Sequence, residues 1–352
     1  MLIVHMLAPI HVIRVLVVSS QAGLIEIYVS TMLFEYVQAQ LRMLKIIESR
    51  WSGMCTSPIG GTVNVKKFAS SSGTIWKYVF EFEGAIAEAV LYRYNKFEER
   101  TVICCSVQSG CPVGCTFCGT GKSFIRNLTC DEIVSQINHI IYDNQLNIKE
   151  TKKFQIMFMS MGEPMLNWPV VGAAIITFRS MYPQHVDLLV STVGIRDEEV
   201  WGKLVELSKE IPTLGLQFSI HQAYEVERDR LIPYENKYSL REIRDKAIEW
   251  HMVTGRRVYL NYCVSKTNSD LFTMERLKDI FPKDICHFTF SVICEKDKGV
   301  CSTHNIERVN GIIEDFQEEG YEVSLFNPDG QDDIGAGCGQ LWYVQDYLEN
   351  KV

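Results

Sequence analysis

Apolar and polar positions follow two different periods along the chain. Between residues 62 and 94, three segments alternate or run in β-forming residues, separated by Ser-Ser-Gly and by Gly84, which predicts a small antiparallel sheet. After residue 100, seven strand-like runs alternate with helical segments. The runs are TVICCSV, FQIMFMS, VDLLVST, LGLQFSI, VYLNYCVS, HFTFSVI and YEVSLF, and helices are expected at 129–143, 167–180, 197–209, 239–253, 270–280 and 306–319. This alternation predicts a parallel sheet curled into a full or partial barrel.

One helix start and several strand ends carry recognisable signals. Thr129 followed by Glu132 is the pattern of a capping box at a helix N-terminus. Small and polar residues gather just after the predicted strands, where the carboxyl ends of parallel strands share one edge. These residues are the crowded cysteines, Gly162–Pro164, Ser191–Thr192, Ser219–His221 and Asn268. The sequence therefore predicts one catalytic site assembled from several separate segments.

Composition and charge narrow the class of protein. A chain of 352 residues with 47% hydrophobic content suits one large α/β domain with a smaller appendage. A formal net charge of -8 excludes a protein coated in positive charge, so any nucleic acid must be bound by a local basic patch. Lys66, Lys67, Lys122 and Arg126 are candidates for that patch, and a solvated charged face is the equal alternative.

The first ~42 residues are apolar but are interrupted by charged residues and histidines. No uncharged run reaches the length of a membrane span, and no basic region precedes a cleavage-like site. We therefore expect no stable membrane association and a cytoplasmic location. The segment is either a packed element or upstream sequence included by a misassigned start, with Met43 as the alternative start.

Five of the twelve cysteines, Cys104, Cys105, Cys111, Cys115 and Cys118, crowd one short stretch. A secreted disulfide scaffold is shorter and spaces its cysteines along the chain, so this crowding indicates metal ligands or redox groups. The last three have C-x3-C-x2-C spacing. A closed zinc site takes four ligands, and no second pair stands out, whereas three thiolates leave one iron of a cubane cluster open to a small molecule. The spacing favours a cluster, with another iron-sulfur role, zinc or a buried apolar set as alternatives.

Several motifs carry a more specific resemblance. Residues 101–127, TVICCSVQSGCPVGCTFCGTGKSFIRN, resemble the RlmN/Cfr group of RNA adenine methyltransferases, and MSMGEPMLN, LLVSTVGI, LQFSIHQAYEVERDRLIPYENKYSL and DIGAGCGQL resemble it in the same order. The resemblance runs from about Ser71 to Leu341. It implies an α/β fold with a small antiparallel sheet at residues 61–96. A partial (β/α)6 radical S-adenosylmethionine (SAM) barrel with a C-terminal catalytic cysteine loop is implied at 97–345. The group's helical RNA-binding domain is not recognisable in residues 1–60.

The resemblance also implies the cofactors and their contacts. Cys111, Cys115 and Cys118 are expected to hold a 4Fe-4S cluster whose open iron binds SAM, and two SAM molecules are expected per turnover. The expected SAM contacts are Gly162, Glu163, Ser191, Ser219, Ile220 and His221. His221 has the alternative of being a satisfied rim or core histidine. The group's Asn-Pro contact is missing near Cys294, and Glu295 is the candidate replacement.

A catalytic pair is implied at Cys104 and Cys338. In the implied reaction, Cys338 takes a methyl group from one SAM, and a second SAM yields the 5'-deoxyadenosyl radical that removes a hydrogen from that S-methyl group. The carbon radical adds to adenine, Glu88 removes the ring proton, and Cys104 attacks Cys338 to release the product as a transient disulfide. The alternative for either cysteine is a small buried residue, and for Glu88 a solvated strand glutamate.

The predicted function is methylation of carbon 2, or as a lesser candidate carbon 8, of an adenosine in 23S rRNA, with tRNA as a further candidate. A flavodoxin-like or other one-electron donor and a monomeric state are expected. Two rival functions stay open at this point. One is a radical SAM enzyme acting on a small molecule or a protein. The other is a non-catalytic RNA-binding relative that keeps the cluster as a structural element.

Overall fold

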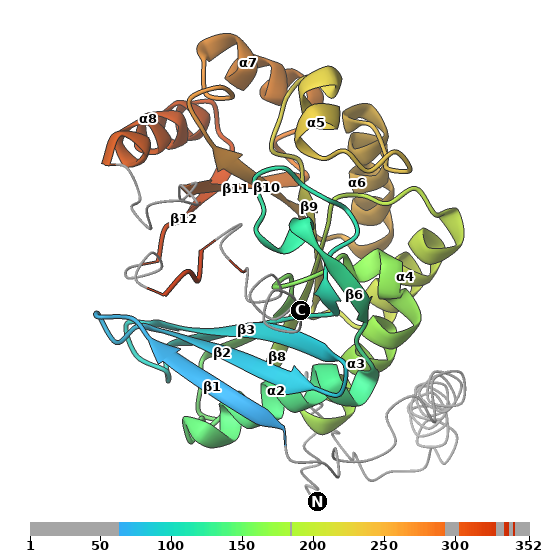
Figure 1. Cartoon of the computed structure of the whole chain (residues 1–352). Coiled ribbons are helices and arrows are strands. Elements are labelled where there is room, and N and C mark those ends of the chain that lie inside the picture. The colour runs from blue at the N-terminus through green and yellow to red at the C-terminus, as the bar shows by residue number, and fades with distance from the viewer. Residues whose placement is uncertain (1–62, 184, 293–302, 329–333, 338–340, 342–352) are drawn as a thin grey trace, which may run out of the picture. The chain divides into compact units, whose positions relative to one another are not determined.

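The computed structural model describes residues 63–183, 185–292, 303–328, 334–337 and 341. Contacts divide the chain into residues 1–50 and 51–352, and the described residues all belong to the second unit. Ten strands form one sheet in the order β1-β2-β3-β4-β7-β8-β9-β10-β11-β12 (Figure 1), and β5 and β6 form a separate ribbon. The strands are β1 (Asn64–Ala69), β2 (Ile75–Phe82), β3 (Ala85–Tyr94), β4 (Arg100–Cys105), β5 (Gln108–Gly110), β6 (Phe124–Asn127), β7 (Lys153–Phe158), β8 (Val186–Thr192), β9 (Leu214–Ser219), β10 (Val258–Val264), β11 (Cys286–Val292) and β12 (Glu322–Phe326).

The helices connect the parallel strands and cover one side of the sheet. They are α2 (Cys130–Asp143), α3 (Trp168–Met181), α4 (Glu198–Glu210), α5 (Glu225–Leu231), α6 (Leu240–Thr254), α7 (Leu271–Ile280) and α8 (Thr303–Glu318), with short 3-10 helices η1 (Thr120–Lys122) and η2 (Pro164–Asn167). Helices α3, α4, α6 and α8 contact β8, β9, β10 and β11 in turn, so they form an outer layer (Figure 1). The capping box at Thr129 is confirmed, since its hydroxyl accepts from the Glu132 amide and the Glu132 carboxylate accepts from the Thr129 amide.

The small antiparallel sheet expected near the N-terminus is present as β1–β3, but it is not separate from the rest. Strand β3 pairs antiparallel with β4, which also pairs in parallel with β7. Strand β2 is buried on both faces because its alternate residues pack in opposite directions. Tyr78 and Phe80 contact His139 of α2, whereas Val79 belongs to a cluster on the other face. The appendage is therefore an extension of the main sheet.

The parallel part of the sheet is larger than six strands. Strands β4 and β7–β12 are parallel to their neighbours, and helical segments connect each to the next. The seventh strand is β12, which lies within the run YEVSLF and pairs with β11. In this pairing His287 lies opposite Glu322, and Phe290 lies opposite Leu325. The strand order is linear over the described ranges. The α/β class is confirmed, and the structure gives a large, mostly parallel sheet where the sequence predicted a partial (β/α)6 barrel.

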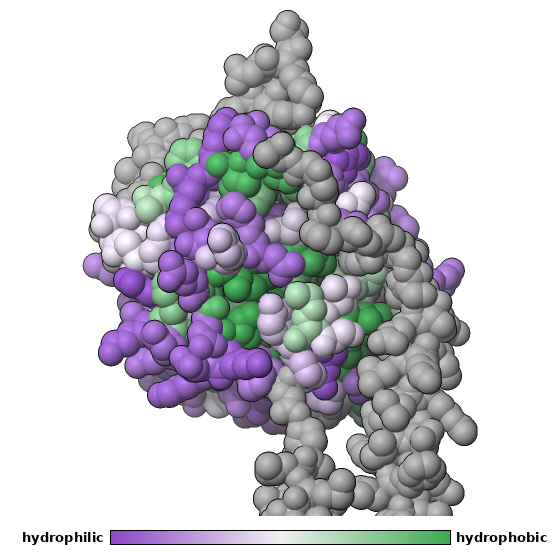
Figure 2. All heavy atoms as spheres, turned by 90° about the horizontal axis from the view of Figure 1, so that it is seen from below, coloured by the Kyte–Doolittle hydropathy of each residue, from purple (hydrophilic) through white to green (hydrophobic). Residues whose placement is uncertain are grey.

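The surface mixes polar and apolar residues. On the face drawn in Figure 2, hydrophilic residues cover much of the area and hydrophobic residues gather near the centre. Exposed large apolar side chains include Tyr142, Met252, Leu271 and Phe272, which lie on three different helices. Among the described helices, none has the length and apolar character needed to cross a bilayer.

Candidate active site

The ribbon of β5 and β6 brings both ends of the cysteine loop together. Gln108 pairs with Asn127 and Ser109 with Arg126, and the Cys111 amide donates to the Ser123 carbonyl at 2.9 Å. Gly110 has a φ of +78°, and a Cβ there would lie 2.1 Å from the Ser123 oxygen. Only glycine fits so close an approach. The ribbon therefore fixes the start and the end of residues 111–123.

The three cysteines of this loop are half-buried and line one cavity. The Cys118 amide donates to the Cys115 carbonyl at 3.1 Å, and the Thr116 amide donates to Leu231 of α5 at 2.9 Å, so the loop is held between the ribbon and α5. Burial raises the pKa of the Cys111 thiol to about 12. A bound metal would offset that cost because thiolate ligands are stabilised by its charge. Three soft ligands on one loop beside a cavity therefore fit an iron-sulfur cluster.

The cavity has a volume of about 680 Å³, which is within the usual range for a small-molecule site. Its walls bring together most of the residues predicted as SAM contacts. Those that line it together with the three cysteines are Gly162, Glu163, Ser191, Ser219 and His221. Ile220 is fully buried and its amide donates to the Asn261 carbonyl at 3.1 Å. Ile220 therefore supports the cavity wall from behind, and its side chain is not part of the lining.

Glu163 is a buried carboxylate held by backbone groups. It follows β7, and its two oxygens accept from the Met165 amide at 3.0 Å and the Val193 amide at 2.9 Å. Burial raises its pKa to about 7, although these hydrogen bonds favour the charged form. The preceding Gly162 has a φ of +98°, and a Cβ there would lie 2.6 Å from the Gln108 Cβ. The carboxylate is therefore fixed in place and keeps lone pairs for a cationic ligand.

His221 is buried in the fold and also forms part of the cavity wall. Its backbone has a φ of +54°, which is uncommon for a residue with a side chain. Its Nδ1 accepts from the Cys263 amide at 3.1 Å, and burial lowers its pKa to about 3, so the ring stays neutral. The ring also lies edge-on to the ring of Phe117, and the two ring centroids are 5.1 Å apart. Phe117 stands between Cys115 and Cys118 in the sequence. His221 is a satisfied buried histidine that also lines the cavity.

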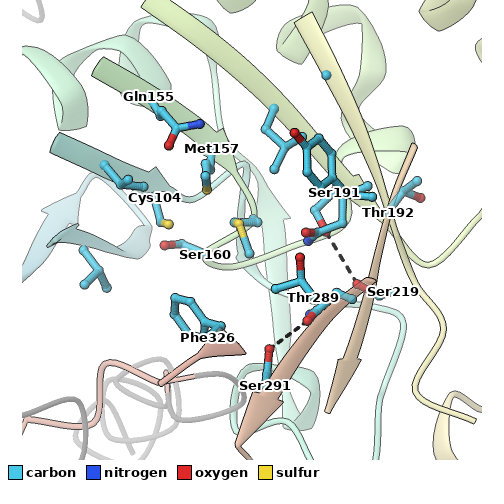
Figure 3. Close-up of a pocket in the computed structure, with 18 of the residues that line it drawn as sticks. Cys104, Gln155, Met157, Ser160, Ser191, Thr192, Ser219, Thr289, Ser291 and Phe326 are labelled. Atoms are coloured by element: carbon cyan, nitrogen blue, oxygen red, sulfur yellow. Dashed lines mark hydrogen bonds between the residues drawn. The ribbon is translucent and has the colours of Figure 1, made fainter. Parts of the chain in front are cut away.

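The strands contribute a polar wall, of which the sequence reasoning predicted Ser191 and Ser219 but missed Gln217, Asn261, Thr289 and Ser291. Figure 3 shows Ser191, Ser219, Thr289 and Ser291 around the same space. The Gln217 amide group donates to the Ser191 hydroxyl at 2.9 Å, and the Ser291 hydroxyl donates to Asn261 at 2.8 Å. Such residues stand singly inside apolar strands, as in LGLQFSI and VYLNYCVS. Isolated polar residues inside otherwise apolar strands were the signal that could have identified them.

Cys104 and Glu88 occupy different positions relative to the cavity. Cys104 lies on β4 and lines the cavity near Met157 and Ser160 (Figure 3), and burial raises its pKa to about 12. Glu88 lies on β3 and is not among the lining residues. Its side chain is 0% exposed and lies 3.3 Å from the Lys77 ammonium group. The alternative that Glu88 is a solvated strand glutamate is therefore wrong, because its carboxylate is buried and ion-paired.

Two predicted site residues, Cys338 and Glu295, lie outside the described residues. Residues 334–337 before Cys338 and Leu341 after it are described, however. Ala336, Gly337 and Leu341 line the cavity. The Tyr92 hydroxyl donates to the Ala336 carbonyl at 2.6 Å, and the Thr120 hydroxyl donates to the Leu341 carbonyl at 2.6 Å. Segments from both flanks of Cys338 therefore reach the same cavity.

The basic residues considered for phosphate binding are largely compensated by carboxylates. Lys66 pairs with Glu81 at 2.9 Å, Lys67 with Asp143 at 2.6 Å and Arg126 with Glu132 at 2.7 Å. Exposed Lys122 belongs to η1, beside the cysteine loop. Three of the four candidate side chains thus form ion pairs within the chain. These pairs depend on the folded structure and are not visible in the sequence.

No protein-family model matches the chain. A probable dual-specificity RNA methyltransferase RlmN of Thermotoga neapolitana is 32% identical, with 78% of each chain covered. The protein of the same name from Pseudothermotoga lettingae is 35% identical, covering 79% of this chain and 78% of the relative.

A solved structure gives the same result. The crystal structure of a radical SAM methyltransferase from Sphaerobacter thermophilus has a TM-score of 0.67 to this chain at 25% identity, covering 79% of this chain and 80% of that one. Identity above 30% over more than three quarters of both chains establishes common membership. The chain therefore belongs to the RlmN/Cfr-type family of radical SAM RNA methyltransferases.

Proposed function

We propose that this chain adds a methyl group to carbon 2 of an adenosine in 23S rRNA, with tRNA as a second substrate. The observation that carries the proposal is a shared cavity. It is lined by the three cysteines of one loop, by Cys104, and by the residues that flank Cys338 in the sequence. The names of the relatives, which are dual-specificity RNA methyltransferases, support RNA as the substrate class.

In this proposal, Cys111, Cys115 and Cys118 hold a 4Fe-4S cluster. When bound, the cluster and SAM supply a carbon-centred radical. The Glu163 carboxylate, already fixed by two backbone amides, receives the ammonium group of SAM, because an ionised carboxylate makes strong hydrogen bonds to a cation. Hydroxyl groups of Ser191 and Ser219, which lie 3.5 Å apart, orient its polar parts. We assign two SAM molecules to each turnover.

Adenine carbon 2 is not nucleophilic enough to take a methyl group directly, so a carrier is needed. We assign that role to the Cys338 thiolate, which would hold the carbon as S-methylcysteine. Once the adduct has passed one electron to a one-electron acceptor and its ring proton to a base, the Cys104 sulfur would attack the Cys338 sulfur. The bond between that sulfur and the transferred carbon would break, the carbon would take up a proton to become the methyl group, and the two cysteines would be left as a disulfide. The pKa of Cys104, raised to about 12 by burial, keeps it an unreactive thiol at neutral pH, so its attack needs a proton acceptor.

Glu88 is our candidate for the base that removes the ring proton. It shares a face of the sheet with Cys104, because Val90, two residues on, pairs directly with Cys104. Because Glu88 does not line the cavity, it would act from the edge of the site. A flavodoxin-like or other one-electron donor, a monomeric state and a cytoplasmic location complete the proposal.

The test is mass spectrometry of nucleosides from RNA incubated with reconstituted enzyme, reductant and SAM labelled in its methyl group. We expect labelled 2-methyladenosine with the wild type and none with Cys338→Ala, while Cys286→Ala, at a buried cysteine outside the cavity, retains product. Label only in 8-methyladenosine would correct the carbon. Cleavage of SAM without any label in RNA would contradict the proposal and favour a small-molecule or protein substrate.

A further inference from the structure

Three ionisable side chains lie in two neighbouring rows on one face of the sheet. Lys77 of β2 pairs with Val90 of β3, and Val90 pairs with Cys104 of β4. In the next row, Val79 pairs with Glu88. Residues that pair across antiparallel strands, and those two apart along a strand, project to the same side. Lys77, Glu88 and Cys104 therefore share the face that packs against Ala336 and Leu341.

From this buried position Lys77 contacts a carboxylate and a backbone carbonyl. Its side chain is 3% exposed, and its Nζ lies 3.3 Å from the Glu88 carboxylate. The same Nζ donates to the Gly335 carbonyl at 3.1 Å. A lysine is almost never this deeply buried unless it is paired. The two partners are 247 residues apart in the sequence (335 minus 88), so Lys77 joins the base candidate to the C-terminal segment.

The C-terminal segment that Lys77 contacts, residues 334–337 and 341, also accepts hydrogen bonds from other side chains. Tyr92 donates to Ala336 and Thr120 donates to Leu341. The side chains of Ala336 and Leu341 are buried in the hydrophobic cluster that also contains Cys104. Cys338 is three residues from Gly335 and three from Leu341 in the sequence. Described contacts therefore hold the chain both before and after Cys338 in the sequence.

We propose that Lys77 is a positioning residue for the methylation reaction, because one ammonium group holds both the Glu88 carboxylate and the Gly335 carbonyl. This inference rests on the proposed function and adds to it a link between the base and the segment before the carrier cysteine. Tyr92 and Thr120 each donate one described hydrogen bond to the C-terminal segment. Lys77 alone, among the contacts described for residues 334–337 and 341, also contacts the base.

The chemistry of a buried ion pair explains why a lysine is needed. Burying a charged group is costly unless an opposite charge pairs with it. The Lys77 ammonium group, 3.3 Å away, is the cation that pairs with the buried Glu88 carboxylate. Removing only the lysine leaves the carboxylate without this cation, and such changes are strongly destabilising. Removing both charges together is tolerated better, which provides a folded control.

The experiment uses the full chain, purified and reconstituted without oxygen, in five forms: wild type, Lys77→Met, Lys77→Arg, Tyr92→Phe and the double variant Lys77→Met with Glu88→Gln. Hydrogen exchange of the peptide covering residues 334–341 measures how tightly the segment is held, without RNA or SAM. Denaturing gels of reactions with labelled RNA measure the covalent protein-RNA adduct that persists when the ring proton is not removed.

We expect both Lys77→Met forms to exchange about tenfold faster in this peptide, the effect of losing one hydrogen bond to a charged group. Lys77→Met should also accumulate adduct, and Lys77→Arg should restore turnover to within about threefold, because it keeps the cation. Tyr92→Phe should speed exchange without accumulating adduct, since it leaves the contact between Lys77 and Glu88 intact.

Unchanged exchange in both Lys77→Met forms would overturn the inference, and so would equal adduct in Tyr92→Phe and Lys77→Met. If Lys77→Met does not fold, the double variant still reports on exchange and Lys77→Arg on turnover. Failure of the proposed function gives a different result. The wild type would then form no methylated RNA, and the positioning role would fall with it even if exchange in the Lys77→Met forms were faster.

Discussion

At the scale of single residues, the cavity walls are organised by backbone contacts. Both oxygens of Glu163 accept backbone amides, and Nδ1 of His221 does the same. The Asn268 side chain donates to the carbonyls of His221 and Cys263, both at 2.9 Å. Side chains held in this way need little rearrangement when a ligand binds. We therefore expect small local changes in backbone to affect binding strongly.

Gly162→Ala tests this expectation at one position. Its new Cβ would meet the Gln108 side chain at 2.6 Å, whereas a Cβ at Gly84, which also has a positive φ, meets nothing within 4 Å. Both substitutions carry the strain of a left-handed backbone, so Gly84→Ala is a matched control. We expect Gly162→Ala to weaken SAM binding at least about tenfold relative to Gly84→Ala, because it shifts Glu163. Isothermal titration with SAM measures this, and equal affinities would contradict the role assigned to Gly162.

His221 predicts a dependence of stability on pH. Its pKa is lowered to about 3 in the folded chain, against about 6.5 when unfolded. Below pH 6.5 the unfolded chain binds a proton that the folded chain does not, so the free energy of unfolding decreases as pH falls. From this group alone the loss between pH 7 and pH 5 is about 2 kcal/mol. Asparagine also tolerates a left-handed backbone and does not titrate in this range. Between pH 7 and pH 5, the free energy of unfolding of His221→Asn should therefore fall by about 2 kcal/mol less than that of the wild type, as measured by urea titration of the metal-free chain. Identical pH profiles would count against the burial of a neutral ring.

At the scale of elements, the short strands β5 and β6 fix the cysteine loop, whereas longer strands build the main sheet. The ribbon of β5 and β6 fixes the ends of the loop, and Arg126 of β6 binds Glu132 in the first turn of α2 through both nitrogens, at 2.7 and 2.8 Å. Glu132 also completes the capping box with Thr129. The start of α2 is thus joined to the strand that ends the cysteine loop.

Thr129→Ala should lower the free energy of unfolding by about 1 kcal/mol, the usual cost of losing a helix N-cap. Ser135→Ala removes a hydroxyl further along the same helix, where it donates to the Glu132 carbonyl, and should change stability by less than about 0.5 kcal/mol. Urea denaturation of the metal-free chain compares them. An equal effect of the two substitutions would show that the cap does not stabilise this junction.

Most regular elements could be predicted from the sequence, and the short ones could not. The strand of β7, predicted over FQIMFMS, and the capping box at Thr129 depend on local patterns. The ribbon has strands of only three and four residues, and α5 has seven, which is too short for a period to be visible. The seventh parallel strand was visible as a segment, but its pairing with β11 is a long-range property.

The same distinction applies to the site. The C-x3-C-x2-C spacing identified the loop because all three residues are close in sequence. The partner of Glu88 could not be identified, since nothing local marks Lys77 as buried. The ion pairs of the basic candidates could not be identified for the same reason, because Glu81, Asp143 and Glu132 meet their partners only once the chain is folded.

At the scale of the whole molecule, the sheet places chemistry from both ends of the sequence on one cavity. Strand β4 holds Cys104 and the loop after β5 holds Cys111, Cys115 and Cys118. Ala336, Gly337 and Leu341 line the same space, and Glu88 of β3 lies outside its lining. This arrangement needs the antiparallel extension, because Lys77 and Tyr92 lie there. The extension is therefore part of the catalytic apparatus that we propose.

The central claim is that three cysteines of one loop hold an iron-sulfur cluster, and the most direct test is a count of iron and acid-labile sulfide after anaerobic reconstitution. We predict about four of each per wild-type chain, almost none in the triple variant Cys111→Ala, Cys115→Ala and Cys118→Ala, and wild-type values when the buried Cys105 and Cys286 are replaced by alanine instead. Equal iron in the wild type and the triple variant, or none in either, would contradict the account.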